Sequence, residues 1–447
     1  MGDKLISFFA CLALFFLAAG PVLGQDQQQA PKLKGYITVK PASHTVVEDL
    51  KGELAATGST SKSALPLFTY SVESDRDGNR YTGVIVGADP FHNHGNRDAR
   101  VKTFIIPVIT TLNSVGVNFD SKTLTWSTTP GVTVFDPTTA DTACLGNAGN
   151  NVPLTLLQQS PLVNNALFDV GGTIVGKVQY TDSIQRAEFW NALGEDGRED
   201  YHLRLDPVVT LSPIRINIPA TAPDGKTVLG VTLPSTPFAS CNPLGIIDFN
   251  FFDKLIQTSL LPAVASQGVG PDTFPIFLFH NVVTGLQPLT SLLNCCFLGY
   301  HSSTSTVPFQ TYSPLEFDTT GLFGAGGSDT SVMSHEVAEW ANDPFGDNLT
   351  PAWGGTGQVP VGFCQNNLEV GDPLTGSSFS PIVMPNGFTY HLQELTFFSW
   401  FYTFTSVGIH GWFSNNGTFL SNAGPVCVSA PSNGASVPPT SLIPHMK

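Results

Sequence analysis

The sequence predicts an α+β protein, with a β-sandwich-like domain in its N-terminal part and a mixed domain of helices and strands in its C-terminal part. Two observations carry this prediction. Short β-like runs, broken by Gly, Asn and Asp, recur between residues 36 and 137. From Asp248 onward, stretches with apolar residues at helical spacing are interspersed with the patterns of buried strands.

The composition is that of a compact exported chain. Only 12% of the 447 residues are charged, whereas 43 are Gly, 34 Pro and 32 Phe, which is typical of a loop-rich and mostly β protein. The 35 acidic residues outnumber the 20 basic ones and give a net charge of -15. This charge argues against nucleic acid and against anionic membrane surfaces as partners.

The first residues have the pattern of a secretory signal peptide, predicted over residues 1–24. Lys4 precedes an apolar run at residues 5–19, and small residues before Gln25 suit cleavage. A Gln-rich flexible leader is expected at residues 25–35. Since no other stretch approaches the roughly 18 apolar residues of a membrane span, we expect a secreted protein, extracellular or periplasmic, without a membrane span.

The cysteine count favours disulfides. Removal of the signal peptide takes Cys11 away and leaves six cysteines, an even number in a chain predicted to be exported. The sequence does not show which of them pair. Because Cys295 and Cys296 are adjacent, we expect them to bond to different partners.

The β-sandwich-like domain is predicted over residues 36–137. An Asp-Gly turn within residues 75–79 is expected to connect two strands as a hairpin. The histidines of Phe91–His94 would share one face of a strand, but a loop rich in Gly and Asn favours solvated side chains over metal ligands. The expected strands are at residues 36–39, 67–72, 81–86, 103–109, 115–119 and 124–127.

Residues 138–240 form a β-rich middle region that we expect to pack against the last domain. A helix is predicted over Asp182–Leu193, because Ile184, Ala187 and Trp190 lie at helical spacing behind Asp182. Strands are predicted at residues 208–218 and 227–233, separated from each other by a Pro-Asp-Gly turn at 223–225.

The last domain is predicted over residues 241–428 and carries the candidate site. A helix of about four turns begins near Asp248, because apolar residues from Phe251 to Leu261 recur at helical spacing. A disordered tail rich in Pro and Ser follows at residues 429–447. Buried strands are expected at residues 273–283, 296–300 and 309–317, before a Gly-rich loop at 324–327.

The chemistry of the chain is concentrated in one predicted helix. Ser328 or Asp329 would cap its start, and Pro344 would end it after Asn342. His335 and Glu339 lie one turn apart on one face, with Glu336 beside them, while the opposite face is apolar.

This pattern is a variant of H-E-x-x-H, in which two histidines bind zinc and the glutamate activates a water molecule. Glu339 takes the place of the second histidine, and zinc accepts carboxylate oxygen as well as imidazole nitrogen. We therefore predict His335 and Glu339 as metal ligands and Glu336 as the general base. The alternative is a polar helix face with an internal ion pair or a buried, hydrogen-bonded histidine.

The longer motif resembles a known group of proteins. H-E-x-x-E-W-x-N-D-P begins at His335 and is followed by T-P-A-W (350–353), N-L-E-V-G-D-P (367–373) and Y-H-x-Q-E-L (390–395). Together these motifs resemble a family of uncharacterised exported bacterial proteins that are labelled as metallopeptidases. A looser form, H-E-x-x-E followed by E-[IV]-[AG]-D, resembles the secreted phosphate-induced, Exordium-like proteins of plants.

The order of helix, strands and metal-bearing helix resembles that of zincin metallopeptidases, which implies a zincin-like last domain. In the Glu-zincin subgroup the third ligand is a downstream glutamate, so the resemblance implies Glu369 in that role. Asp372 is the alternative ligand or a hydrogen-bonding partner of the ligands. His391 would be a spare ligand or a hydrogen-bond donor to the transition state.

Two functions follow from these residues. The first is a secreted zinc-dependent peptidase that hydrolyses a peptide or protein substrate with a metal-activated water molecule. The second is a non-catalytic exported or wall-associated binding protein with a structural ion or none. Calcium is the alternative metal, since oxygen-rich ligation favours a harder cation. The sequence does not predict the oligomeric state.

Overall fold

The computed structural model describes residues 36–40, 65–92, 97–116, 129–147, 149–235, 240–359, 363–422 and 427. The predicted signal peptide (1–24), leader (25–35) and tail (429–447) lie outside the described residues. The same holds for His94 and for the strand expected at residues 124–127.

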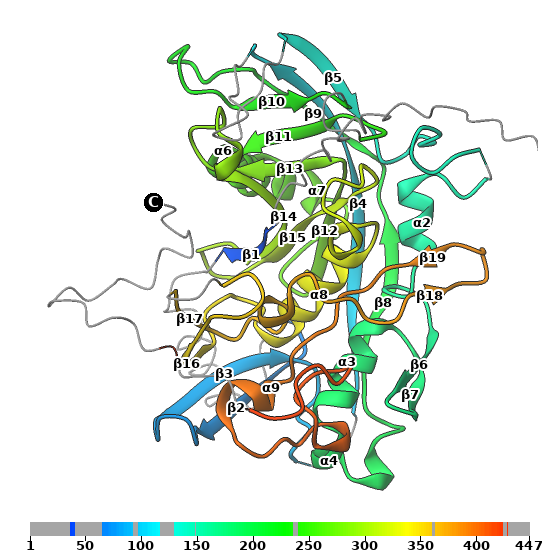
Figure 1. Ribbon diagram of the computed structural model, residues 1–447, viewed down its shortest axis with the longest axis vertical. Helices are drawn as coiled ribbons and strands as arrows, with labels where there is room; N and C mark the ends of the chain where they lie inside the picture. Colours follow the sequence, from blue (N-terminus) through cyan, green and yellow to red (C-terminus); the bar gives the residue numbers. More distant parts are fainter. Residues whose placement is uncertain are drawn as a thin grey trace, which may run out of the picture. The chain divides into compact units, whose positions relative to one another are not determined.

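One mixed sheet organises the described part of the chain, which contains more strand than helix (Figure 1). This sheet has eleven strands. Strand β1 (Tyr36–Lys40) pairs with β14, and β8 (His202–Thr210) and β9 (Ile214–Ile218) pair with β4. The other strands follow the order β10 (Gly230–Leu233), β11 (Leu244–Asp248), β13 (Val282–Gly285), β14 (Cys295–Ser303), β15 (Thr311–Phe317), β12 (Thr273–His280), β4 (Asp98–Ser114) and β5 (Gly131–Phe135).

The sheet curls until it is nearly closed. The end of β4 reaches β10, where the hydroxyl oxygens of Ser114 and Thr232 lie 2.7 Å apart. A Cβ atom at Gly230 would lie 2.5 Å from the side chain of Leu112. The close approach of the two strands therefore requires glycine at this position.

Strands from all three predicted regions lie side by side in this sheet. In β4, Val101 pairs with Leu205 of β8, and Ile105 pairs with Ile276 of β12. This arrangement differs from a separate N-terminal β-sandwich over residues 36–137. The continuous apolar run at residues 104–109 marks β4 as a buried strand, but parallel pairing joins segments far apart in the chain and leaves no local signal of the partner.

The sheet has an apolar core on each face. Along β12, Phe274, Ile276 and Leu278 contribute to one cluster of buried side chains, and Phe277 and Phe279 contribute to another. This alternation is the geometry of a strand whose successive side chains point to opposite faces. Such a strand is apolar throughout because both of its faces are covered.

Helices cover both faces. On one face, α8 (Ser331–Asn342) stacks Trp340 on Phe274, with ring centroids 3.8 Å apart. On the other, α6 (Phe249–Leu255), the π-helical turn η2 (Ile256–Leu260) and α7 (Leu261–Ala265) form the continuous helix that the sequence predicts. Asp248 caps it by accepting a hydrogen bond from the Phe251 N–H at 2.8 Å.

The other elements surround the sheet. The hairpin expected around residues 75–79 is confirmed by β2 (Leu67–Glu73) and β3 (Arg80–Val86). The helix predicted over 182–193 is divided into α3 (Tyr180–Glu188) and α4 (Trp190–Leu193). The remaining elements are α2 (Pro153–Gln159), β6 (Ala166–Val170), β7 (Thr173–Val178), β16 (Leu349–Trp353), β17 (Gln365–Asn367), β18 (Ile382–Val383), β19 (Thr389–Tyr390), α9 (Phe398–Tyr402) and short 3-10 turns at Glu195–Gly197, Leu292–Asn294, Ala325–Gly327, Asp372–Leu374 and Ile409–Gly411.

The six cysteines form three pairs at disulfide distance, as the even count predicts. Cys144 pairs with Cys241 at 2.06 Å, and Cys364 pairs with Cys427 at 2.01 Å. The expectation of different partners for Cys295 and Cys296 is wrong, because their sulfur atoms pair with each other at the start of β14. Within the described ranges, no helix has both the length and the apolar character that crossing a bilayer requires.

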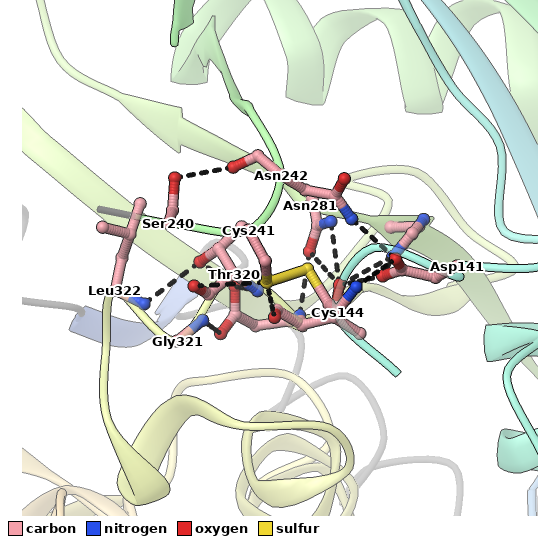
Figure 2. Close-up of a disulfide and its surroundings, with 12 residues drawn as sticks. Asp141, Cys144, Ser240, Cys241, Asn242, Asn281, Thr320, Gly321 and Leu322 are labelled. Atoms are coloured by element: carbon pink, nitrogen blue, oxygen red, sulfur yellow. Dashed lines mark hydrogen bonds and ion pairs between the residues drawn. A yellow bond between two sulfur atoms is a disulfide. The ribbon is translucent and has the colours of Figure 1, made fainter. Parts of the chain in front are cut away.

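Figure 2 shows the Cys144–Cys241 disulfide in a polar setting. The carboxylate of Asp141 accepts hydrogen bonds from the Cys144 N–H at 3.0 Å and from the Asn242 side-chain amide at 2.8 Å. The bond joins the loop after β5 to the segment just before β11 across a sequence separation of 97 residues. It therefore closes a long loop of the unfolded chain.

Replacing both Cys144 and Cys241 by serine is expected to lower the free energy of unfolding by about 4 kcal/mol, because the loop-entropy contribution of a disulfide grows with the length of the loop it closes. Urea unfolding of the double variant and of the unmodified protein, both without reductant, measures the difference. A difference below about 0.5 kcal/mol would contradict this expectation.

Candidate metal centre

Helix α8 carries the predicted motif but is buried on all sides. It ends after Asn342, as expected from Pro344, and it begins at Ser331, later than the predicted caps. Asp329 accepts a hydrogen bond from the Thr330 N–H at 2.6 Å just before the helix. All twelve residues of α8 are buried, so the face that carries the histidine and the glutamates packs against other parts of the chain.

Titratable side chains gather where α8, β14 and the segment after β17 meet. Their potential ligand atoms form two groups of three, and within each group these atoms lie within 4.8 Å of one another. One group contains His335, Glu336 and Glu339, and the other contains His301, Glu339 and Glu369. We call the following residues, which are all 0 or 1% exposed, the buried cluster: His301, His335, Glu336, Glu339, Glu369 and Asp372.

The ring of His335 is oriented by Gln393. The side-chain N–H of Gln393 donates to the carbonyl of Gly371 at 2.7 Å, so its oxygen faces His335 Nδ1 at 3.0 Å as an acceptor. Nδ1 must donate, which leaves the lone pair of the neutral ring on Nε2. Nε2 lies 2.9 Å from Glu339 Oε1 and 3.4 Å from Asp372 Oδ1, and no described residue hydrogen-bonds to it.

The two downstream ligand candidates are held in a similar way. Glu339 Oε1 accepts the backbone N–H groups of Gly371 at 2.9 Å and Asp372 at 3.2 Å. Glu369 Oε1 accepts a hydrogen bond from the Asn367 side chain at 2.7 Å. Oε2 of each glutamate is buried without a donor from the described part of the chain. One oxygen is thus fixed by the protein and the other is available, as in carboxylates oriented for a metal.

His301, on β14, was not predicted as a site residue. Its Nε2 donates to the carbonyl of Asp343 at 2.9 Å, and its Nδ1 lies 2.9 Å from Glu336 Oε2 and 3.9 Å from Glu339 Oε2. Burial lowers the pKa of His301 to about 3; the Asp343 carbonyl opposes this and the charge of His335 adds to it. The neutral ring therefore directs the Nδ1 lone pair at carboxylates.

The buried cluster contains more acidic groups than its positive charge can compensate. Burial, followed by the charges of neighbouring carboxylates, holds the pKa of Glu339 and of Glu369 well above the usual range. Burial lowers the pKa of His335, but Asp372 and Glu336 outweigh burial and the net shift is upward. In the absence of a cation the cluster therefore retains protons, which a bound divalent ion would displace.

Two glycines allow the surrounding backbone to approach α8. A Cβ atom at Gly371 would lie 2.4 Å from the nearest atom of the His335 ring. A Cβ atom at Gly299 of β14 would lie 2.9 Å from Val332 and 3.3 Å from Cγ of Glu336. A larger residue at either position would displace a side chain of the buried cluster or of its supporting helix.

The structure brings most of the predicted residues together. His335, Glu336 and Glu339 share one group, whereas Glu369 joins Glu339 in the group that contains His301. Asp372 lies beside His335, in agreement with a role as ligand or hydrogen-bonding partner.

Two other predicted candidates lie elsewhere. His391 belongs to neither group, and its partly exposed ring pairs with Asp329 at 2.6 Å. The segment that follows His391 is not helical until α9, and the ring of His391 lies beside Asp329, directly before α8. His92 pairs with Asp89 at 2.9 Å and its side chain is 65% exposed, as expected for a solvated histidine.

No opening to the buried cluster is seen in the described residues. Each of its members is at most 1% exposed. A small pocket lies beside β14 and β15, lined by Phe252, Phe279 and Glu316 among others, and no residue of the buried cluster lines it. A substrate would therefore reach Glu336 only if the surrounding segments moved.

No protein-family model, curated protein or solved structure matches this chain. The assignment of the centre therefore depends on its own geometry.

Proposed function

We propose that this chain is an exported metalloprotein in which the buried cluster binds a divalent transition-metal ion, most simply zinc, and in which that ion stabilises the fold. One observation carries the proposal. Glu339 Oε2 and Glu369 Oε2 are buried without a hydrogen-bond donor from any described residue, and His335 Nε2 faces the carboxylates of Glu339 and Asp372. Another atom of each of the three side chains, His335, Glu339 and Glu369, is held by a protein donor or acceptor. Buried polar atoms normally have a partner, and a cation would supply it here.

The donor set supports zinc over calcium. Two imidazole nitrogens and several carboxylate oxygens are available, and zinc binds both kinds of atom. Calcium prefers six to eight oxygen ligands, so imidazoles in each group of three count against it.

The centre joins segments that are distant in sequence. Its ligand candidates come from β14, from α8 and from residues 369–372, which pack against one another in the interior. An ion here would cross-link these segments and compensate buried negative charge. This role corresponds to the non-catalytic alternative expected from the sequence.

Export is part of the proposal. The chain begins with the pattern of a signal peptide, and cysteine pairs at disulfide distance are consistent with an oxidising compartment.

The second candidate is a zincin-like zinc-dependent peptidase, and the position of Glu336 favours it. Glu336 follows the ligand candidate His335 directly and lies in the same group of three as Glu339. In this function the three ligands would be His335, Glu339 and Glu369, the metal would supply an activated water molecule, and Glu336 would accept its proton. The complete burial of Glu336 counts against this function unless the site opens to admit substrate.

The metal content of the purified mature protein tests the main proposal. We expect zinc to remain bound after dialysis and to be lost in Glu339→Gln. Glu188→Gln is the matched control, because Glu188 is an equally buried glutamate outside the cluster. Absence of any bound metal after the protein is refolded in the presence of zinc would overturn the proposal.

The variant Glu336→Gln separates the two functions. If the centre is structural, the zinc-loaded protein hydrolyses no member of a mixed peptide library above background, and Glu336→Gln changes nothing in this assay. Hydrolysis that falls by about 10²- to 10⁴-fold in Glu336→Gln, with zinc retained, would instead establish the peptidase, because a general base contributes about that factor.

A further inference from the structure

We infer that the buried cluster holds two metal ions, with Glu339 as the ligand that bridges them. This inference rests on the proposed metal-binding function and adds a second site centred on His301.

The two histidines face different oxygens of the same carboxylate. His335 Nε2 lies 2.9 Å from Glu339 Oε1, whereas His301 Nδ1 lies 3.9 Å from Glu339 Oε2. A carboxylate can coordinate through either oxygen, and Glu339 is the residue that the two groups of potential ligands share. With one ion near each histidine, Glu339 would be a ligand of both ions.

Each group is sufficient for one ion. The first site has His335, Glu336 and Glu339, with Asp372 Oδ1 at 3.4 Å from His335 Nε2. The second site has His301, Glu339 and Glu369. Both sites thus offer an imidazole and at least two carboxylates, and three protein ligands are enough for zinc when water or another ligand completes its coordination.

The charges of the cluster also fit two ions. Glu336, Glu339, Glu369 and Asp372 carry four negative charges when ionised and are at most 1% exposed. No lysine or arginine among the described residues pairs with Glu339, Glu369 or Asp372. Two divalent ions compensate four ionised carboxylates, whereas with one ion two of the carboxyl groups must either retain their protons or remain as uncompensated charge in the interior, which is strongly unfavourable.

The two sites are not equivalent. In the first site, Glu339 Oε1 already accepts two backbone N–H groups, and the Asp372 carboxylate accepts hydrogen bonds from Gln358 and Gln365. In the second site, Oε2 of Glu339 and Oε2 of Glu369 have no donor in the part of the chain that the structure describes. The second site therefore binds its ion more tightly, and a chelator removes the ion of the first site earlier.

Elemental analysis and calorimetric titration with zinc alone, on the full mature chain, test the inference. We expect two zinc ions per chain in the unmodified protein and in Glu188→Gln. His301→Ala and His335→Ala should each retain one, and stepwise chelation of the unmodified protein should release the ions in two phases.

The outcomes separate the inference from the proposed function. One ion in the unmodified protein, with a single phase of release, overturns the second site and leaves the metal-binding function standing. No bound ion overturns both. The stoichiometry of the unmodified protein does not depend on whether a histidine variant folds, and circular dichroism shows which variants do.

Discussion

Replacing Glu339 by glutamine is expected to destabilise the protein when zinc is bound and to stabilise it when zinc is absent. With zinc, Glu339→Gln should lower the free energy of unfolding by an amount on the order of 10 kcal/mol, the scale of structural zinc binding. A loss of this size equals much of the stability of an ordinary domain. Without zinc, the variant should be more stable than the unmodified protein, because it removes a carboxyl group that must take up a proton to be buried.

Thermal unfolding of both proteins, with zinc and with excess chelator, measures this reversal. Glu188→Gln again serves as the control, because burial also raises the pKa of Glu188, to about 8, without a neighbouring group of ligands. The control should behave alike with and without zinc. Equal destabilisation of Glu339→Gln under both conditions would mean that Glu339 has only a packing role.

Removal of the metal is expected to make stability fall as the pH rises from about 6.5 to 8.5. The pKa of Glu339 and of Glu369 is raised in the folded protein, so the folded state binds more protons than the unfolded state in this range. Stability then decreases with pH by about 1.4 kcal/mol per pH unit for each additional proton bound. His335 contributes in the same direction, because its pKa is also raised in the folded protein. His301 does not contribute, because it is neutral in both states above its ordinary pKa.

With zinc bound, this slope should become much smaller, because the metal replaces the protons of the carboxyl groups. Urea unfolding at several pH values, with zinc and with chelator, gives both slopes. The pKa of Glu188 is raised in both forms of the protein, so its contribution cancels in the comparison. A metal-free protein whose stability is constant over this range would show that Glu339 and Glu369 titrate normally.

The part of the site that lies on one helix could be predicted from the sequence. Helical spacing places His335 and Glu339 one turn apart, and Pro344 determines where α8 ends; these are short-range effects. The sequence places these polar residues opposite the apolar face and gives no sign that they are covered. In the structure, β14 and the segment around Gly371 cover the polar face of α8. No local sequence pattern predicts this contact.

His301 could not be predicted, because its role depends on which strand packs under α8. It is a single histidine in an apolar strand and has no spacing relation to the helical motif. Gly299 permits the close contact of β14 with α8, and this contact brings the ring to Glu336. The only sequence signal was a histidine directly after the buried strand predicted at residues 296–300.

The large sheet was predicted only in parts. Several of its strands were recognised from their patterns, including most of β12 and β15. The prediction grouped β4 with strands that are close to it in the sequence. Its partners β8 and β12 instead lie about 100 or more residues away along the chain. Pairing at such distances is decided by the packing of both faces of the sheet.

The burial of the cluster also has a kinetic consequence. An ion enclosed by side chains that are at most 1% exposed can leave only when the segment around Gly371, or β14, separates from α8. Exchange with free metal is then as slow as this local opening. The ion captured while the chain folds is therefore retained, and the metal found in the protein reflects the supply at the time of folding more than later equilibrium with its surroundings.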